Sequence, residues 1–227
     1  MHLAEAQSET DFVMKNKNMR SIEYIDKIGF FTNKTVGAHV IQANDKEIDI
    51  LKKHNVGVAH NPESNMKLAA GVAPIPQMLA KKLRVGLGTD GAASNNDLNM
   101  WEEMDTAAKL HKVFWKDPKV ISAKEAFEMA TIGGARALHL DDKIGSIETG
   151  KKADIVIVSF DGLHQTPFYN VYSHLVYSTK ATDVETVIVN GKVLMLNKKL
   201  RTLNEKSIKK EANLLHAKIV KSLMTKN

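Results

Sequence analysis

Two hydrophobic periods alternate along the first 140 residues. Short runs rich in valine, alanine and glycine occur at about 36–39, 56–60 and 85–89, as in buried strands. Between and after them, apolar residues recur at helical spacing in five segments: about 20–29, the segment after Asn44, 74–82, 98–112 and 123–138. Strands that alternate with helices predict βαβ units and a parallel sheet.

Two of these helices carry a start signal in the sequence. Asn44 stands three residues before Glu47, and Ser122 stands three residues before Glu125. Both pairs fit the capping box, in which each side chain bonds the other residue's backbone N–H. We therefore expect helices to begin directly after Asn44 and Ser122.

The pattern changes near residue 141. Residues 153–158 read as a strand, and 186–195 read as a hairpin with a type I′ turn at Asn190-Gly191. Residues 204–224 then place apolar side chains on one helical face. We expect this stripe to pack in the core or in a homo-oligomer; its members are Ile208, Ala212, Leu215, Ile219 and Leu223.

Charge and composition narrow the class of protein. The net charge is +6, but residues 198–227 hold nine Lys/Arg and two Asp/Glu, so the rest of the chain carries about −1. A solvated basic helix explains this better than a nucleic-acid site. The chain has no cysteine and no apolar run near the ~20 residues of a membrane span. We expect a cytoplasmic protein without nucleic-acid or membrane partners.

Chemistry-bearing residues stand at the predicted strand ends. His39 and His60 each close an apolar run, and His2 begins an H-x-x-E pattern with Glu5. Asp90 follows the run at 85–89, where a buried carboxylate must be paired, protonated or bound to a metal. Because the ends of parallel strands meet at one edge, these residues predict a metal site.

The other histidines lack such a setting. We expect them to be structural or exposed and to have no partner; they are His54, His111, His139, His164, His174 and His216.

Several linked motifs carry a resemblance to a known family. They are H-L-A-E at 2–5, G-A-H at 37–39, A-H-N-P-E-S-N at 59–65, G-T-D-G-A-A-S-N-N at 88–96 and G-x-x-x-x-G-K-x-A-D-I-V at 145–156. In this order they resemble the amidohydrolase superfamily. Within it, the chain is similar to the branch of 5-methylthioadenosine/S-adenosylhomocysteine deaminases and chlorohydrolase-like enzymes.

The resemblance implies an α/β fold, the C-terminal half of a (β/α)8 TIM-type barrel. Residues 1–140 would supply barrel strands five to eight with their helices, and 141–200 part of a small β-sandwich. Residues 201–227 would form a basic amphipathic C-terminal helix.

The resemblance also implies roles for single residues. His2 and Asp90 would bind the metal, and Asp90 would also accept a proton from water. Glu5 would bind a purine ring nitrogen and protonate it. His39 would contact the substrate or orient the nucleophile, and His60 would lie on the substrate side or behind the site.

The reaction so implied is hydrolytic deamination of an adenine nucleoside to its inosine analogue and ammonia. One divalent metal, zinc first and iron or manganese as alternatives, would lower the pKa of water from about 15.7 toward about 7. The substrate would be 5-methylthioadenosine or S-adenosylhomocysteine.

One departure from the family pattern is clear. The family carries H-x-H on barrel strand one, and no H-x-H occurs in this sequence. We therefore expect two further ligands on a missing N-terminal half of the barrel, and an inactive fragment without that half. A split gene, a mis-started gene and a truncated protein all fit. Other amidohydrolase reactions (guanine deamination or triazine hydrolysis) and a catalytically dead partner subunit remain alternatives.

Overall fold

The computed structural model describes residues 1–224, so positions 225–227 of the predicted C-terminal segment lie outside the described residues. Contacts between residues divide the chain into two units. The first unit comprises residues 1–151 and 160–183, and the second comprises 152–159 and the chain from 184 onward.

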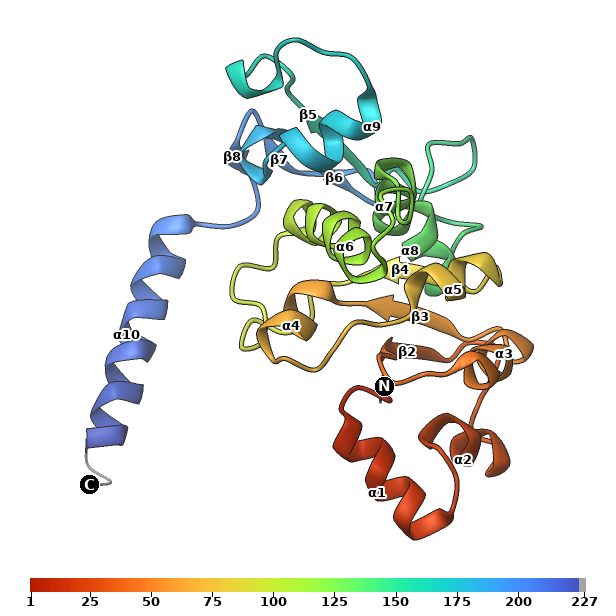
Figure 1. Ribbon diagram of the computed structural model, residues 1–227. Coiled ribbons are helices and arrows are strands. Elements are labelled where there is room, and N and C mark those ends of the chain that lie inside the picture. The colour runs from red at the N-terminus through yellow and green to blue at the C-terminus, as the bar shows by residue number, and fades with distance from the viewer. Residues whose placement is uncertain (225–227) are drawn as a thin grey trace. The chain divides into compact units, whose positions relative to one another are not determined.

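A four-stranded parallel sheet organises the first unit (Figure 1). Its strands are β1 (His2–Leu3), β2 (Val36–His39), β3 (Gly57–His60) and β4 (Arg84–Leu87), paired in sequence order. Every neighbouring pair is parallel. The predicted α/β class with a parallel sheet is confirmed.

Eight helices surround or connect these strands. They are α1 (Gln7–Lys17), α2 (Ser21–Lys27), α3 (Asp45–Lys53), α4 (Pro62–Lys67), α5 (Ile75–Ala80), α6 (Met100–Trp115), α7 (Ala123–Ala130) and α8 (Ile132–Ala137). Both predicted capping boxes are present, at Asn44 with Glu47 and at Ser122 with Glu125. The sequence analysis missed α1, in which only Thr10 is buried, and the six-residue α4.

The predicted helix over 123–138 is two helices instead of one. Thr131 breaks it with φ −122° and ψ −102°. The break lets α8 lie against β4, where Gly86 and Gly134 face each other so closely that a Cβ on Gly86 would stand 2.5 Å from the Cα of Gly134. Close backbone packing of this kind requires glycine.

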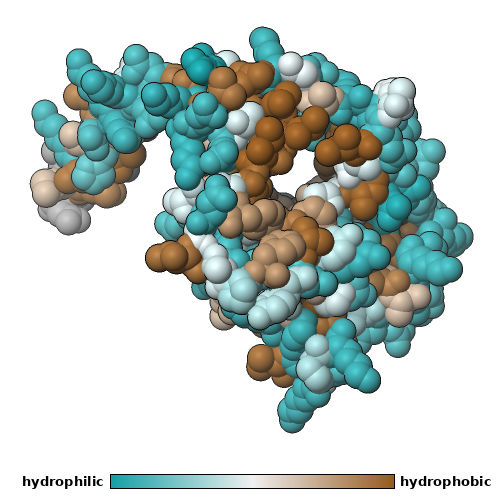
Figure 2. Space-filling view, turned by 90° about the horizontal axis from the view of Figure 1, so that it is seen from above, coloured by the Kyte–Doolittle hydropathy of each residue, from teal (hydrophilic) through white to brown (hydrophobic). Residues whose placement is uncertain are grey.

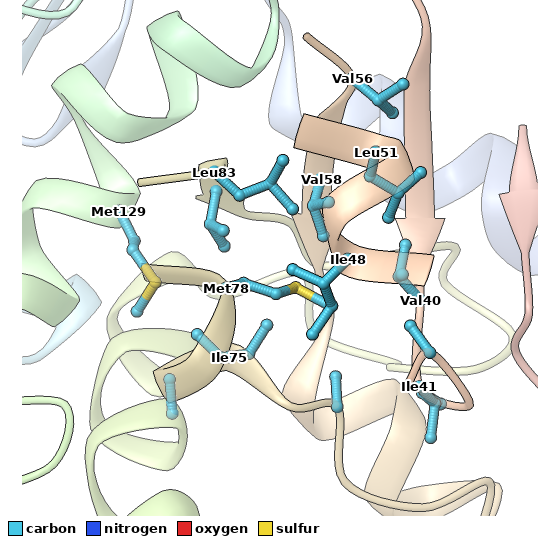
Figure 3. Close-up of a cluster of buried hydrophobic side chains, with 14 of the residues drawn as sticks. Val40, Ile41, Ile48, Leu51, Val56, Val58, Ile75, Met78, Leu83 and Met129 are labelled. Atoms are coloured by element: carbon cyan, nitrogen blue, oxygen red, sulfur yellow. The ribbon is translucent and has the colours of Figure 1, made fainter. Parts of the chain in front are cut away.

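The core of the first unit joins the sheet to its helices (Figure 3). Val58 of β3 packs in the same cluster as Ile48 and Leu51 of α3 and Ile75 and Met78 of α5, and all five are at most 1% exposed. Burying a side chain of this size stabilises the fold by roughly 1.5–3 kcal/mol. The cluster holds the strands in place, and the polar strand ends lie at its edge.

The remainder of the first unit is a run of short turns of helix. They are η1 (Leu163–Gln165), α9 (Val171–Ser173), η2 (His174–Ser178) and η3 (Ala181–Asp183). The π-helical turn η2 contacts α6 and α7.

The second unit holds an antiparallel sheet of β5 (Ile155–Val158), β6 (Val184–Val189), β7 (Lys192–Leu196) and β8 (Lys199–Leu200). Asn190 and Gly191 join β6 to β7 with φ values of 49° and 76°. Two consecutive positive φ values fit the predicted type I′ turn.

The helix α10 (Glu205–Met224) ends the described chain. No residue of it is buried, and both hydrophobic and hydrophilic residues show on its surface at the left of Figure 2. The predicted packing of its apolar stripe in the core is therefore not found, and packing in a homo-oligomer stays a prediction. Among residues 1–224, no helix is both long and apolar enough to cross a membrane.

Candidate metal centre

Three of the four predicted strand-end residues lie at or just beyond the carboxyl ends of the parallel strands, whereas His2 begins its strand instead of ending it. His39 ends β2, His60 ends β3, and Asp90 stands three residues after β4, while His2 lies in the short strand β1. His39 and Asp90 adopt left-handed backbone conformations, with φ 71° and 58°. Such conformations are costly for non-glycine residues and cluster at functional sites.

His2, Glu5 and His39 form one group of potential metal ligands, because one donor atom of each lies within 4.8 Å of the other two. Glu5 Oε2 is 3.2 Å from His2 Nδ1 and 3.8 Å from His39 Nε2. The rings of His2 and His39 meet edge to face with centroids 4.7 Å apart. The His2 side chain is 66% exposed and Glu5 is 23% exposed, so the group is open on one side.

His39 is fully buried. Its Nδ1 is contacted by one residue of α4 and by the residue that precedes α4. Its Nδ1 lies 2.9 Å from Asn65 Oδ1 and 3.4 Å from Asn61 Nδ2. When Nδ1 carries the proton and donates to Asn65, Nε2 presents its lone pair. That Nε2 is buried and has no hydrogen-bond partner in the structure. An imidazole nitrogen with a free lone pair can bind a cation or accept a hydrogen bond.

Asp90 is held as a carboxylate by two serines. Ser64 Oγ donates to Asp90 Oδ2 at 2.6 Å, and Ser94 Oγ donates to the same oxygen at 2.7 Å. Burial alone would raise the pKa of Asp90, but the hydrogen bonds from Ser64, Ser94 and the Gly91 backbone, together with the charge of His39, lower this pKa to about 2. The carboxylate lies outside the group of His2, Glu5 and His39.

His60 has a different environment. It is fully buried, and its Nε2 lies 3.1 Å from His111 Nε2 on α6. Burial lowers the pKa of both histidines, that of His111 to about 4 and that of His60 well below its usual value. Both are therefore neutral near pH 7, and a contact between His60 and a substrate stays a prediction.

The expectation that the remaining histidines have no partner was wrong at five positions. His139 and His174 contact backbone carbonyls, and three others meet side chains that are distant in sequence. His111 bonds His60, His54 Nε2 lies 2.6 Å from Asp26 Oδ1, and His164 Nε2 lies 2.9 Å from Asp183 Oδ2. Each of these side-chain partners is at least 19 residues away in sequence. Local patterns carry no signal for such pairs.

The residues that the sequence analysis missed lie inside the motifs that it quoted. Asn61, Ser64 and Asn65 follow His60 in A-H-N-P-E-S-N, and Ser94 follows Asp90 in the glycine-rich loop. The two asparagines contact His39, and the two serines donate hydrogen bonds to Asp90. Small polar side chains directly after a strand end were the available signal.

Comparison with known proteins places the chain in a family. Residues 1–194 match the amidohydrolase family. The chain is 45% identical over 223 residues to 5-methylthioadenosine/S-adenosylhomocysteine deaminase of Desulforudis audaxviator, which covers 98% of this chain and 52% of the relative. The chain thus spans about half the length of the curated relatives it matches.

Solved structures agree with the sequence comparison. An adenosine deaminase from Xanthomonas campestris with bound zinc superposes with a TM-score of 0.94 at 34% identity, over 97% of this chain and 50% of that one. The atrazine chlorohydrolase from Arthrobacter aurescens TC1 complexed with zinc gives a TM-score of 0.88 at 26% identity, over 94% and 47%. The matching sequence, the parallel α/β sheet and the histidines and carboxylates at its strand ends lead to one conclusion: this chain belongs to the amidohydrolase family.

Proposed function

We propose that the chain is the C-terminal part of a metal-dependent hydrolase that deaminates an adenine nucleoside. The substrates would be 5-methylthioadenosine and S-adenosylhomocysteine, and the products the inosine analogue and ammonia. The observation that carries the proposal is the group of His2, Glu5 and His39, in which the buried His39 Nε2 faces Glu5 without a hydrogen-bond partner. The similarity to a deaminase over nearly the whole chain supports the choice of reaction.

The proposed architecture is the second half of a closed barrel. The sheet has two edges, β1 and β4, which the described residues leave without a further strand. Open edges are a liability that barrel closure removes. We propose that an upstream half pairs with both edges, that residues 1–140 form barrel strands five to eight and that 141–200 form part of a β-sandwich. The segment 201–227 would hold the basic amphipathic C-terminal helix.

The side-chain types at the strand ends suit one divalent cation, and zinc is the first candidate. Imidazole nitrogens and carboxylate oxygens are ordinary zinc ligands. His2 and Asp90 would hold the ion together with two ligands from the upstream half. When bound, the cation supplies a water molecule of lowered pKa at neutral pH.

The side chains of this chain divide the remaining tasks. Glu5 reaches both His2 and His39 with one carboxylate oxygen and is partly exposed. It can therefore carry a proton to a purine ring nitrogen. His39, with its proton on Nδ1, would accept a hydrogen bond at Nε2 and orient the attacking water.

Asp90 keeps both of its predicted roles. Hydrogen bonds from Ser64 and Ser94 hold it as a carboxylate, which can bind a metal and accept a proton from water. We propose His60 as a residue that supports the substrate side from within the core.

The test is ammonia release by the complete protein, the chain together with its upstream half. We expect turnover of 5-methylthioadenosine and S-adenosylhomocysteine, and loss of turnover in Asp90→Asn. No turnover of either compound would contradict the proposed substrates. The similarity to a triazine-acting enzyme makes atrazine the second substrate to assay and guanine the third. A dead partner subunit would bind no zinc even with the upstream half present.

A further inference from the structure

A buried carboxyl group on α6 lies outside the proposed chemistry. Glu103 is fully buried, and both of its oxygens accept hydrogen bonds. Oε1 accepts from Asn95 Nδ2 at 2.6 Å, and Oε2 accepts from the Glu63 backbone N–H at 3.3 Å. Its two partners come from different segments, the loop after Asp90 and the first turn of α4.

These two partners are the immediate neighbours of the serines that hold Asp90. Asn95 follows Ser94, and Glu63 precedes Ser64. Each serine donates to Asp90 Oδ2, at 2.7 and 2.6 Å. Glu103 therefore spans the loop and α4 one residue away from each hydrogen bond to Asp90.

Asn95 also fixes the shape of the loop. Its Oδ1 accepts from the backbone N–H groups of Asp97 and Leu98, at 3.3 and 3.2 Å, while its Nδ2 donates to Glu103. One side chain thus connects the backbone of the loop to α6. A third link joins the same helices, because Thr106 Oγ1 on α6 donates to Glu63 Oε1 at 2.9 Å.

We propose that Glu103 is a positioning residue, which holds the two serines in place on Asp90 through Asn95 and the α4 backbone. Its meaning for catalysis rests on the proposed function. Without Glu103, the loop loses its side-chain bond to α6, and α4 loses its backbone bond but keeps the one from Thr106 to Glu63. Ser94 and Ser64 are then held less firmly relative to each other. The side chain of Asp90 then no longer has a fixed orientation.

The cost of burying this group argues against a merely structural part. Burial first, and then the nearby charges of Glu63 and Asp97, raise the pKa of Glu103 to about 8, although the hydrogen bonds from the Glu63 backbone and Asn95 lower it. An apolar side chain would fill the same space without that desolvation penalty. The carboxyl group places one acceptor oxygen opposite each of the two donors, Asn95 Nδ2 and the Glu63 backbone N–H.

The first arm of the test is hydrogen–deuterium exchange of the 227-residue chain. We expect backbone amides of residues 91–99 to exchange about fivefold faster in Glu103→Ala, because the one hydrogen bond that ties this loop to Glu103, worth about 1 kcal/mol, is lost. Glu103→Gln keeps one acceptor and should show a smaller increase, while amides of β2 and β3 should be unaffected. Lys109→Gln, on an exposed residue of α6 whose hydrogen bond goes to Asp105 on the same helix, is the control and should match the unsubstituted chain.

Asn95→Ala removes the hydrogen bond between Asn95 and Glu103 by changing the loop residue. It replaces Glu103→Ala in the test if that variant does not fold. It should also accelerate exchange in residues 91–99. Unchanged exchange in the loop of either folded variant would overturn the proposal.

The second arm uses the complete protein and separates positioning from general stability. Glu103→Ala should lower kcat about tenfold with KM changed less than about twofold, and Glu103→Gln should recover part of the loss. Faster loop exchange with an unchanged kcat would overturn the positioning role. Inactivity of the unsubstituted complete protein would instead contradict the proposed function, and the exchange results would then decide on Glu103 alone.

Discussion

His39 and His60 occupy equivalent places and have different surroundings. Each ends one of two neighbouring parallel strands, and each is fully buried. His39 is bonded through Nδ1 to an amide of Asn65, which leaves Nε2 toward Glu5. His60 is bonded through Nε2 to a second imidazole, that of His111.

The difference shows what the end of a strand does and does not determine. The strand brings an imidazole to the edge of the sheet, but a partner from a helix decides which nitrogen remains available. Asn65 on α4 leaves a lone pair beside a carboxylate, whereas His111 on α6 uses the corresponding nitrogen of His60. We therefore expect His39 to accept a hydrogen bond or bind a ligand at Nε2, and His60 to stabilise the core beside the site.

The largest expected effect comes from His39→Gln, which keeps the size of the side chain and removes the imidazole. In the complete protein, ammonia release from 5-methylthioadenosine should fall by about 10²–10⁴, the usual contribution of a positioned acid or base. A thermal melt of the same variant serves as the control for folding. Activity within a few-fold of the unsubstituted protein would erase the distinction between the two histidines.

The pH dependence of stability probes the other histidine pair. Burial depresses the pKa of His111 to about 4 in the folded chain, from about 6.5 when unfolded. Between these values the unfolded chain binds more protons, so stability is full above about pH 6.5 and is lost as the pH falls toward 4. We expect His111 alone to contribute about 3 kcal/mol to this loss, with a further contribution of the same sign from His60.

Urea unfolding at pH 7 and pH 4.5 measures this loss. His111→Phe, which keeps a ring but cannot titrate, should lose less stability over the same interval than the unsubstituted chain. An equal loss in both would show that the pair at His60 does not titrate as a buried neutral pair.

A smaller effect should follow from Asn65→Ala, which frees His39 Nδ1 from its amide partner. Partners of this kind typically contribute 10–100-fold to activity or metal affinity, and Asn61 Nδ2, which is a donor near the same nitrogen, cannot accept the Nδ1 proton in place of Asn65. The readout is kcat of the complete protein, with His39→Gln as the limit. A loss as large as that limit would show that orientation alone accounts for the role of His39.

The sequence predicted the frame of the molecule better than its contacts. Small residues followed by His or Asp indicated the strand ends, and the periods indicated the parallel sheet, because both are local properties of the chain. The break at Thr131 was missed, since it depends on how closely α8 approaches β4. The helix α1 was also missed, because its polar and apolar residues are not separated onto two faces and the sequence shows no helical period there.

The environment of the candidate site could not be predicted either, because its contacts join residues that are far apart in sequence. His60 and His111 are 51 residues apart in sequence, and Asp90 is 26 residues from Ser64. Only the folded chain shows that one histidine is occupied and the other is available. The resemblance supplied roles for His2, Glu5 and Asp90, but not the serines and asparagines that hold the site.

The zinc content of the complete protein decides whether His2 and Asp90 bind the metal. The chain and its upstream half are purified together, and metal is measured in the unsubstituted protein, in His2→Ala and in Asp90→Asn. We expect about one zinc ion per complex, lost or strongly reduced in both variants. No zinc in the unsubstituted complex, or full zinc content in both variants, would contradict this assignment.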